Sequence, residues 1–167
     1  GGYLLLLNND TEMINDDCLN ELLSYTERDD VGITGARLLY EDNTVQHAGV
    51  VIGYNGLAGH TFVGNEPDDV GYHAYVIQAR DYSAVTAACL MVKASLYDEV
   101  GGFEEELEVA FNDVDFCLKV REKGYLVVYN PYAVLYHYES KSRGYEDTPE
   151  KRNRFEKEAF FTYNKWE

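Results

Sequence analysis

The chain has 167 residues, of which 46% are hydrophobic and 26% charged, and these values are typical of one globular domain with a buried core. Its formal net charge is −16, from 14 Lys and Arg residues against 30 Asp and Glu residues, which argues against a nucleic-acid-binding protein because phosphates are neutralised by clustered basic residues. The longest apolar run, residues 84–92, is too short to span a bilayer. The first residues do not show a basic region followed by the apolar region of a signal peptide.

The three cysteines, Cys18, Cys89 and Cys117, are far apart in the sequence and form no CxxC pair. Each has apolar neighbours, so we predict reduced thiols in the core. Reduced cysteines are typical of cytoplasmic proteins. We therefore expect a cytoplasmic location, either free or peripheral at the inner face of the membrane.

The first predicted element is a strand over Tyr3–Leu7, which is apolar on both faces as a central parallel strand would be. A helix is predicted over residues 16–25, with Asn15 as its N-cap and two aspartates at its positive end. The predicted buried face of this helix consists of Leu19, Leu22 and Leu23.

A β-hairpin is predicted next, with strands over residues 31–40 and 45–53 joined by a turn at Glu41-Asp42-Asn43. Residues 54–82 follow as a long loop region, rich in glycine and polar residues. A loop of this length inside a domain is usually functional.

The second half of the chain is predicted to contain three more strands and three more helices, all within one domain over residues 1–167. The predicted strands are residues 86–93, 125–129 and 133–138. The predicted helices are residues 94–100, 114–123 and 148–167. The last of these begins with Thr148-Pro149-Glu150, which supplies a cap, a first-turn proline and an acid.

Acidic and imidazole side chains stand at the ends of several predicted elements. Asp10 follows the first strand, Asp113 and Asp115 begin a helix, and His137 lies near the end of a strand. A carboxylate and an imidazole that end neighbouring strands can share one divalent cation, and carboxylate oxygen suits Mg²⁺ or Mn²⁺. Asp10 is equally well explained as a turn or N-cap residue.

The helix-start acids and the histidine each have a structural interpretation as well. Asp113 can be the N-cap of its helix, with Asp115 as a first-turn acid, or a general base that the rigid helix start holds at a pocket. His137, between two tyrosines on a strand, can be a structural histidine or a ligand. The residues alone leave these alternatives open.

A resemblance to a known family covers essentially the whole chain. Five blocks carry it in order: LLLLNNDT, TGARLLYEDNTVQHAGVVIG, SAVTAACLMVKASLYDEVGGFEEEL, FNDVDFCLKVREKGY and LYHYESKSRG. With these blocks the chain resembles bacterial family 2 glycosyltransferases of the rhamnosyltransferase-like and O-antigen biosynthesis type. The resemblance implies an α/β fold, a partial GT-A domain whose mixed sheet is flanked by helices and which lacks the N-terminal nucleotide-binding half.

The resemblance also implies roles for individual residues. Asn8-Asn9-Asp10 falls on the DXD motif, which binds the metal and the nucleotide diphosphate; Asn8 stands where many members have the first Asp, so Asp10 is the main carboxylate ligand. Asp113 falls on the catalytic base, and Asn112 stands where the family usually has Glu. His137 falls on the histidine that completes the metal site in some relatives.

The implied reaction is an inverting transfer of a sugar from a nucleotide-diphosphate-sugar to a hydroxyl of a glycan or lipid-linked acceptor. Mg²⁺ or Mn²⁺ is the implied cofactor. Ser140, Ser142 and Arg143 belong to a segment that the resemblance places over the donor phosphates. Two other readings remain: a non-catalytic module that binds a glycan or a partner, and a metal-dependent hydrolase.

The position of Asp10, only ten residues from the start of the chain, leads to a further expectation. In the family the DXD strand follows a nucleotide-binding half. We therefore expect these 167 residues to be part of a longer enzyme and to be inactive alone. We also expect them to self-associate through the uncovered edge of the first strand.

Overall fold

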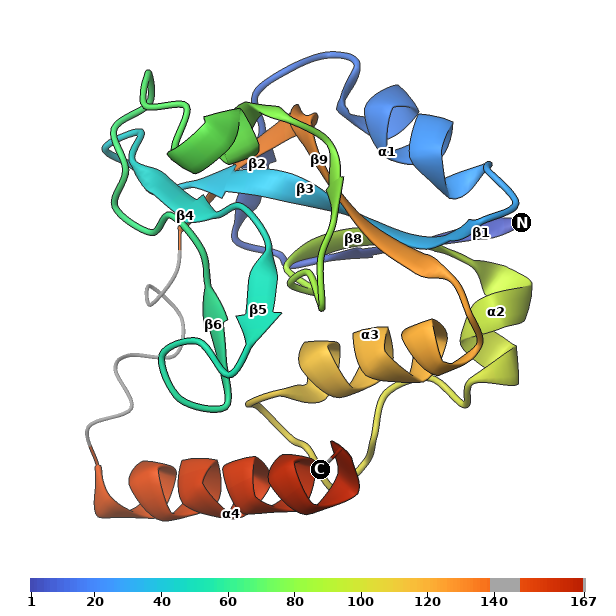
Figure 1. Ribbon diagram of the computed structural model, residues 1–167, viewed down its shortest axis with the longest axis vertical. Coiled ribbons are helices and arrows are strands. Elements are labelled where there is room, and N and C mark those ends of the chain that lie inside the picture. The colour runs from blue at the N-terminus through green and yellow to red at the C-terminus, as the bar shows by residue number, and fades with distance from the viewer. Residues whose placement is uncertain (139–147, 167) are drawn as a thin grey trace.

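The computed structural model describes residues 1–138 and 148–166. Its main feature is a mixed sheet of seven strands with helices on both faces (Figure 1). The strands of this sheet are β1 (Tyr3–Leu7), β2 (Thr11–Met13), β3 (Val31–Leu39), β4 (Val45–His47), β7 (Arg80–Asp81), β8 (Cys89–Lys93) and β9 (Leu126–His137). Their spatial order is β1-β8-β3-β9-β2, with β4 beside β3 and β7 beside β9. The β3–β9 pair is parallel and the other pairs described are antiparallel.

The remaining elements surround this sheet. Strands β5 (Val50–Ile52) and β6 (Ala58–His60) form a separate antiparallel hairpin. The helices are α1 (Cys18–Thr26), α2 (Ala94–Glu99), α3 (Asn112–Glu122), α4 (Pro149–Trp166) and a short 3₁₀ helix (Tyr72–Ile77). No helix among the described residues is both long and apolar enough to cross a membrane.

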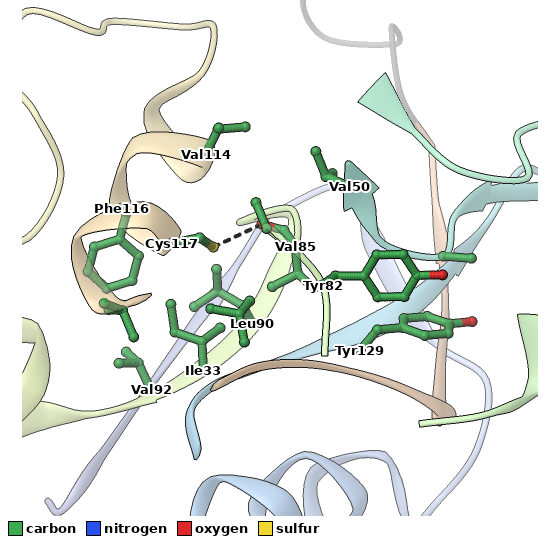
Figure 2. Close-up of a cluster of buried hydrophobic side chains, with 14 of the residues drawn as sticks. Ile33, Val50, Tyr82, Val85, Leu90, Val92, Val114, Phe116, Cys117 and Tyr129 are labelled. Carbon is green, nitrogen blue, oxygen red and sulfur yellow. Dashed lines mark hydrogen bonds between the residues drawn. The ribbon is translucent and has the colours of Figure 1, made fainter. Parts of the chain in front are cut away.

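Two apolar cores lie on the two faces of the sheet. Helix α1 packs on one face, where Cys18 and Leu22 lie in the smaller cluster. Helices α2 and α3 cover the other face, where the larger cluster lies (Figure 1). Figure 2 shows Cys117 of α3 directed toward Val85, and its thiol donates a weak hydrogen bond to the Val85 carbonyl at 3.6 Å. The Phe116 ring packs against the rings of Tyr97 and Phe103. All three cysteines are free and buried, which confirms the prediction of core thiols.

The first strand has the predicted bounds, but the prediction that it is central, parallel and buried on both faces is wrong. Strand β1 lies at the edge of the sheet, antiparallel to β8, and the side chains of Leu4 and Leu7 are 36% and 44% exposed. Apolar residues on both faces of a strand are shielded only where helices or loops cover both sides. Among the described residues no strand pairs with the outer edge of β1.

Two helices begin at other residues than predicted. Helix α1 begins at Cys18 rather than at residue 16, because Asn15 is not its side-chain cap: the Asn15 Oδ1 atom accepts a hydrogen bond from the Val134 amide at 2.9 Å. Of the leucines predicted for the buried face of this helix, Leu22 is fully buried, whereas Leu19 is 47% exposed. Helix α3 begins at Asn112, two residues earlier than predicted.

The predicted hairpin after residue 31 is correct only as far as His47. Leu38 pairs with His47 and Leu39 with Val45, so β3 and β4 are antiparallel neighbours. The chain then turns at Gly49, where φ is +103° and a Cβ atom would lie 2.6 Å from the Tyr82 ring. Glycine meets both requirements, and the following residues form β5 instead of continuing β4.

Strand β9 is continuous, whereas two strands were predicted. Its pairing with β3 shifts between Ala36, which faces Asn130, and Arg37, which faces Val134, so the extra residues around Pro131 form an irregularity within one strand. The Asn130 side chain is fully buried and donates to the Glu21 carbonyl at 2.9 Å, which ties this irregularity to α1.

Candidate active site

The pairing of β2 with β9 brings Asp10 and His137 together. Thr11, the first residue of β2, is the register partner of His137, and the Tyr138 amide donates to the Asp10 carbonyl at 2.9 Å. A turn at Asn9-Asp10 separates β1 from β2. Asp10 therefore lies one residue before the register partner of His137, at the end of this antiparallel pair.

The side chains of these two residues are within contact distance. The Asp10 Oδ1 atom lies 3.2 Å from the His137 Nε2 atom, and the two side chains are 20% and 11% exposed. Apart from the His137 ring, no described group provides a hydrogen bond to this buried carboxylate oxygen. Asn8 joins the cluster, because its Nδ2 atom also lies 3.2 Å from His137 Nε2. A buried carboxylate oxygen and a ring nitrogen therefore converge on the same small volume.

This geometry fits a divalent cation with few protein ligands. An oxygen that lacks a donor is stabilised by a cation, and Mg²⁺ or Mn²⁺ is often held by one or two side chains plus phosphates and water. Among the described residues, no group of three His, Cys, Asp or Glu side chains is arranged to hold a metal ion. Asp10 and His137 would thus supply two ligands and leave the other positions open.

Sequence reasoning missed Gln46, which lies in β4 with 5% of its surface exposed. Its Nε2 atom donates to the His137 carbonyl at 3.2 Å, and its Oε1 atom lies 2.7 Å from His137 Nδ1. No signal in the sequence pointed to this residue, because Thr44 and His47 close to it are polar as well. His137 is therefore held from the side opposite Asp10.

A second histidine is buried behind this cluster. His47 Nδ1 lies 3.0 Å from His60 Nδ1, and His47 Nε2 accepts a hydrogen bond from the Thr86 amide at 3.4 Å. Burial holds the pKa of His47 well below its usual value, and the nearby His60 and His137 lower it further. His47 is consequently a neutral core histidine.

Asp113 lies in the first turn of α3, inside the helix rather than at its N-cap. The N-cap position belongs to Phe111, whose backbone has a φ of +61°. Asp113 Oδ2 accepts from the Ala87 amide at 3.3 Å and Oδ1 accepts from the Val114 amide at 2.9 Å. The carboxylate is half-buried, so it is oriented by backbone donors while part of it stays accessible.

One backbone segment contacts both groups of candidate residues. The Ala87 amide donates to Asp113, and the carbonyl of Ala88 accepts from the Asn8 amide at 2.9 Å. The segment that precedes β8 is therefore shared between the start of α3 and the end of β1. This arrangement connects the predicted base with the DXD-like stretch.

Asp115 has a structural role that differs from the predicted helix-start charge. Its side chain is completely buried and lies 3.1 Å from Lys119 Nζ and 2.9 Å from Lys165 Nζ. The Trp166 indole also donates to it at 2.8 Å. Because Lys165 and Trp166 belong to α4, Asp115 fastens the last helix to α3.

The remaining predicted residues are less informative. Asn9 is exposed in the turn after β1. Ser140, Ser142 and Arg143 lie outside the described residues, so their predicted position over the donor phosphates stays a prediction.

An apolar pocket of about 580 Å³ lies between the β5–β6 hairpin, α3 and α4. Its walls include Ile52, Leu57, Val114, Leu118, Phe160 and Trp166. Val114 follows Asp113 directly in α3, so one wall of the pocket belongs to the turn that carries the predicted base. Its size is that of a ligand site rather than a packing defect.

The chain is similar in sequence to several known proteins. The chain is 49% identical over 167 residues to the uncharacterised protein y4gI of Sinorhizobium fredii and 38% identical over 152 residues to the O-antigen biosynthesis protein RfbC of Myxococcus xanthus. These matches cover 99% and 90% of this chain, which spans 18% and 12% of the length of the two relatives. A shorter match of 60 residues, 35% identical, covers 36% of this chain and 20% of an N-acetylglucosaminyl-diphospho-decaprenol L-rhamnosyltransferase of Mycobacterium tuberculosis. No family model matches the chain.

Solved structures show the same fold. GalNAc-T7, crystallised with UDP, GalNAc and Mn²⁺, matches 89% of this chain with a TM-score of 0.65 and 12% identity. The mannosyltransferase PcManGT of Pyrobaculum calidifontis, in complex with GDP-Man and Mn²⁺, matches 98% with a TM-score of 0.60 and 13% identity. The matches span 30% and 39% of those two chains. The chain therefore has the GT-A fold of these two glycosyltransferases and is similar in sequence to part of an O-antigen biosynthesis protein.

Proposed function

We propose that this chain carries the metal- and diphosphate-binding end and the catalytic base of an inverting glycosyltransferase. The observation that carries the proposal is the convergence of Asp10 Oδ1 and His137 Nε2, 3.2 Å apart, where the carboxylate oxygen is buried and has no donor among the described residues apart from the His137 ring. Such a pair can hold Mg²⁺ or Mn²⁺ against a nucleotide diphosphate, which would complete the coordination sphere. When bound, the cation would act as a Lewis acid that stabilises the negative charge of the departing diphosphate.

Asp113 is the proposed general base. The acceptor hydroxyl would give its proton to the Asp113 carboxylate while its oxygen forms a bond to the anomeric carbon of the donor sugar. The bond from this carbon to the diphosphate oxygen breaks on the opposite face, so the configuration inverts. The hydrogen bonds from the Ala87 and Val114 amides support this role, because a base must be held in one orientation to act efficiently.

The acceptor is proposed to be a glycan or lipid-linked molecule of surface polysaccharide synthesis. The apolar pocket supports an acceptor with an apolar portion, because its walls include Leu57, Leu118 and Phe160 and it borders the turn that holds Asp113. The name of the mycobacterial relative, which specifies a decaprenol-linked acceptor, agrees with this choice. The three buried free cysteines are consistent with a cytoplasmic location.

The experiment that tests this function measures nucleotide release by the whole protein from a panel of nucleotide-sugars with Mn²⁺. Release that requires an acceptor hydroxyl is the expected result. Release onto water alone would indicate the metal-dependent hydrolase, and donor or glycan binding without release would indicate the non-catalytic module. Asp113→Asn and the exposed Asp16→Asn are the matched variants: the first should lower release by about 10²–10⁴-fold, and the second should leave it unchanged.

A further inference from the structure

We infer that Glu158 of α4 is a positioning residue for Asp113, because it holds the turn from which α3 begins. The inference rests on the proposed function, in which Asp113 is the general base. The Glu158 side chain is 4% exposed, and its Oε2 atom accepts a hydrogen bond from the Ala110 amide at 2.5 Å. The two residues are 48 positions apart in the sequence, so this contact joins the last helix to the segment that precedes α3.

The start of α3 lacks a side-chain cap of its own. Its N-cap residue is Phe111, which makes no side-chain hydrogen bond to the helix, whereas Ser, Thr, Asp and Asn are the usual capping residues. Phe111 also has a left-handed backbone with a φ of +61°, a conformation that is costly for a residue with a Cβ atom. Such a conformation persists only where the surrounding structure holds it, and it is frequent at active sites. The groups that hold this turn therefore have to come from outside α3.

Two side chains of α4 contact the turn. Glu158 accepts from the amide of Ala110, the residue before Phe111. The Phe155 ring packs on the Phe111 ring, with 5.2 Å between the ring centroids. The Arg154 Nε atom lies 3.9 Å from Glu158 Oε1, so the backbone amide is the closer of these two partners of the Glu158 carboxylate. One turn of α4 thus holds both the backbone and the side chain at the left-handed residue.

The conformation of Phe111 decides where Asp113 lies. The Phe111 carbonyl accepts a hydrogen bond of the first helical turn, from the Asp115 amide at 2.8 Å, so the backbone angles of Phe111 set the direction in which α3 starts. Asp113 lies in this turn, where its Oδ2 atom accepts from the Ala87 amide at 3.3 Å. A different conformation at Phe111 would displace the carboxylate from this amide. A displacement of about 1 Å can lower the turnover of an enzyme by about 10²-fold.

The first test compares Glu158→Met with Glu158→Gln in the whole protein, by steady-state nucleotide release. Met keeps the length of the side chain but has no oxygen to accept from the Ala110 amide, whereas the Gln carbonyl oxygen can still accept. Glu158→Met should lower kcat by about 10- to 100-fold and leave the donor KM nearly unchanged. Glu158→Gln should keep kcat close to that of the wild type. The exposed Glu156→Met on the same helix is the control and should behave as the wild type.

A double-mutant cycle separates positioning from a general effect on stability. Glycine adopts a left-handed backbone readily, so the turn should depend less on Glu158 in a Phe111→Gly background. In that background Glu158→Met should lower kcat by only a few-fold. A loss of kcat as large as the loss with Phe111 present would show that Glu158 does not act through this turn, and would overturn the inference.

Amide hydrogen exchange in the 167-residue chain, read residue by residue, tests the same contacts without donor or cation. In Glu158→Met the amides of Ala87 and Ala110 should exchange faster, while those of β3 stay as in the wild type. Unchanged exchange at Ala87 and Ala110, or equal acceleration throughout the chain, would contradict the inference. If Glu158→Met does not fold, the wild type decides, since an unprotected Ala110 amide contradicts the contact. A whole protein that transfers no sugar would disprove the proposed function without altering this exchange result.

Discussion

At the residue scale, Asp113 is the proposed general base, and each of its two carboxylate oxygens accepts a backbone hydrogen bond. Asp113→Asn keeps the size of the side chain but cannot take a proton from the acceptor. In the whole protein we expect donor binding to stay within a few-fold and turnover to fall by about 10²–10⁴-fold, the usual contribution of a general base. Steady-state kinetics and donor titration measure both quantities. Turnover close to that of the wild type would show that another group takes the proton.

His47 predicts how stability depends on pH. Its pKa in the folded protein is lowered by burial, whereas the unfolded chain has a histidine pKa of about 6.5. The unfolded state therefore binds the proton first, and stability is lost as the pH falls through about 6.5 toward the folded pKa. We expect the free energy of unfolding to fall by up to about 1.4 kcal/mol per pH unit from this residue. Denaturant titrations at several pH values give the free energy of unfolding at each pH. This free energy should change less with pH in His47→Gln than in the wild type.

The control for this prediction is His73→Gln, because His73 is exposed. The His73→Gln variant should show the same dependence of the unfolding free energy on pH as the wild type. An equal pH dependence in the wild type and His47→Gln would assign it to other groups.

The sequence predicted the residues that meet at the candidate metal site but not how they are held. Asp10 and His137 could be found because polar groups that end neighbouring strands tend to meet, and the resemblance gave them their roles. Gln46 could not be found, because its position depends on a β-bulge that the sequence does not mark. The role of Asp115 in attaching α4 to α3 was missed for a similar reason. Its partner Lys165 lies 50 positions away, so pattern reasoning along one helix cannot detect the pair.

At the scale of secondary-structure elements, the attachment of α4 depends on one buried carboxylate. Asp115 lies 2.9 Å from Lys165 Nζ and 2.8 Å from the Trp166 indole nitrogen. Removal of one partner of a buried ion pair typically costs about 3–5 kcal/mol, because the remaining charges lose their compensation. Asp115→Ala should therefore lower the melting temperature and accelerate amide hydrogen exchange in α4 more than in β3 or β9.

The exposed Glu105→Ala is the control for this variant. It should leave both the melting temperature and the exchange of α4 unchanged. If Asp115→Ala accelerates exchange equally throughout the chain, α4 is not a separate unit attached by this residue.

Local patterns predicted the strand β1 and much of β3, α1 and α3, because apolar periodicity and glycine stops are properties of neighbouring residues. Local patterns failed where contacts with residues distant in the sequence determine where an element begins or ends. Asn15 is engaged by the Val134 amide instead of capping α1, and the position of Tyr82 beside Gly49 ends the return strand of the hairpin. The apolar pattern of β1 suggested a central strand, yet sheet order depends on which strands pair, and the sequence of one strand does not specify that.

At the scale of the whole molecule, the outer edge of β1 predicts self-association. Tyr3, Leu4 and Leu7 are 39%, 36% and 44% exposed on this edge strand, and an apolar strand edge can pair with another chain. We expect light scattering to show dimers or larger species of the 167-residue chain at high concentration. Leu4→Lys should restore a monomer, because a charge on an edge strand opposes pairing.

The matched control is Leu19→Lys, a similar change at an exposed leucine of α1. It should leave the association unchanged. A wild-type chain that stays monomeric at high concentration would contradict this prediction.

The most direct test of the account is the binding of a panel of nucleoside diphosphates to the 167-residue chain, measured by calorimetry with and without Mn²⁺. Asp10 and His137 are the proposed protein ligands, and the diphosphate is expected to supply others. Binding should require Mn²⁺ and should weaken by about 10-fold or more in Asp10→Ala and His137→Ala, while the exposed Asp16→Ala behaves as the wild type. Binding that is independent of Mn²⁺, or equal in the wild type and both site variants, would contradict the assignment of Asp10 and His137 to the metal–diphosphate site.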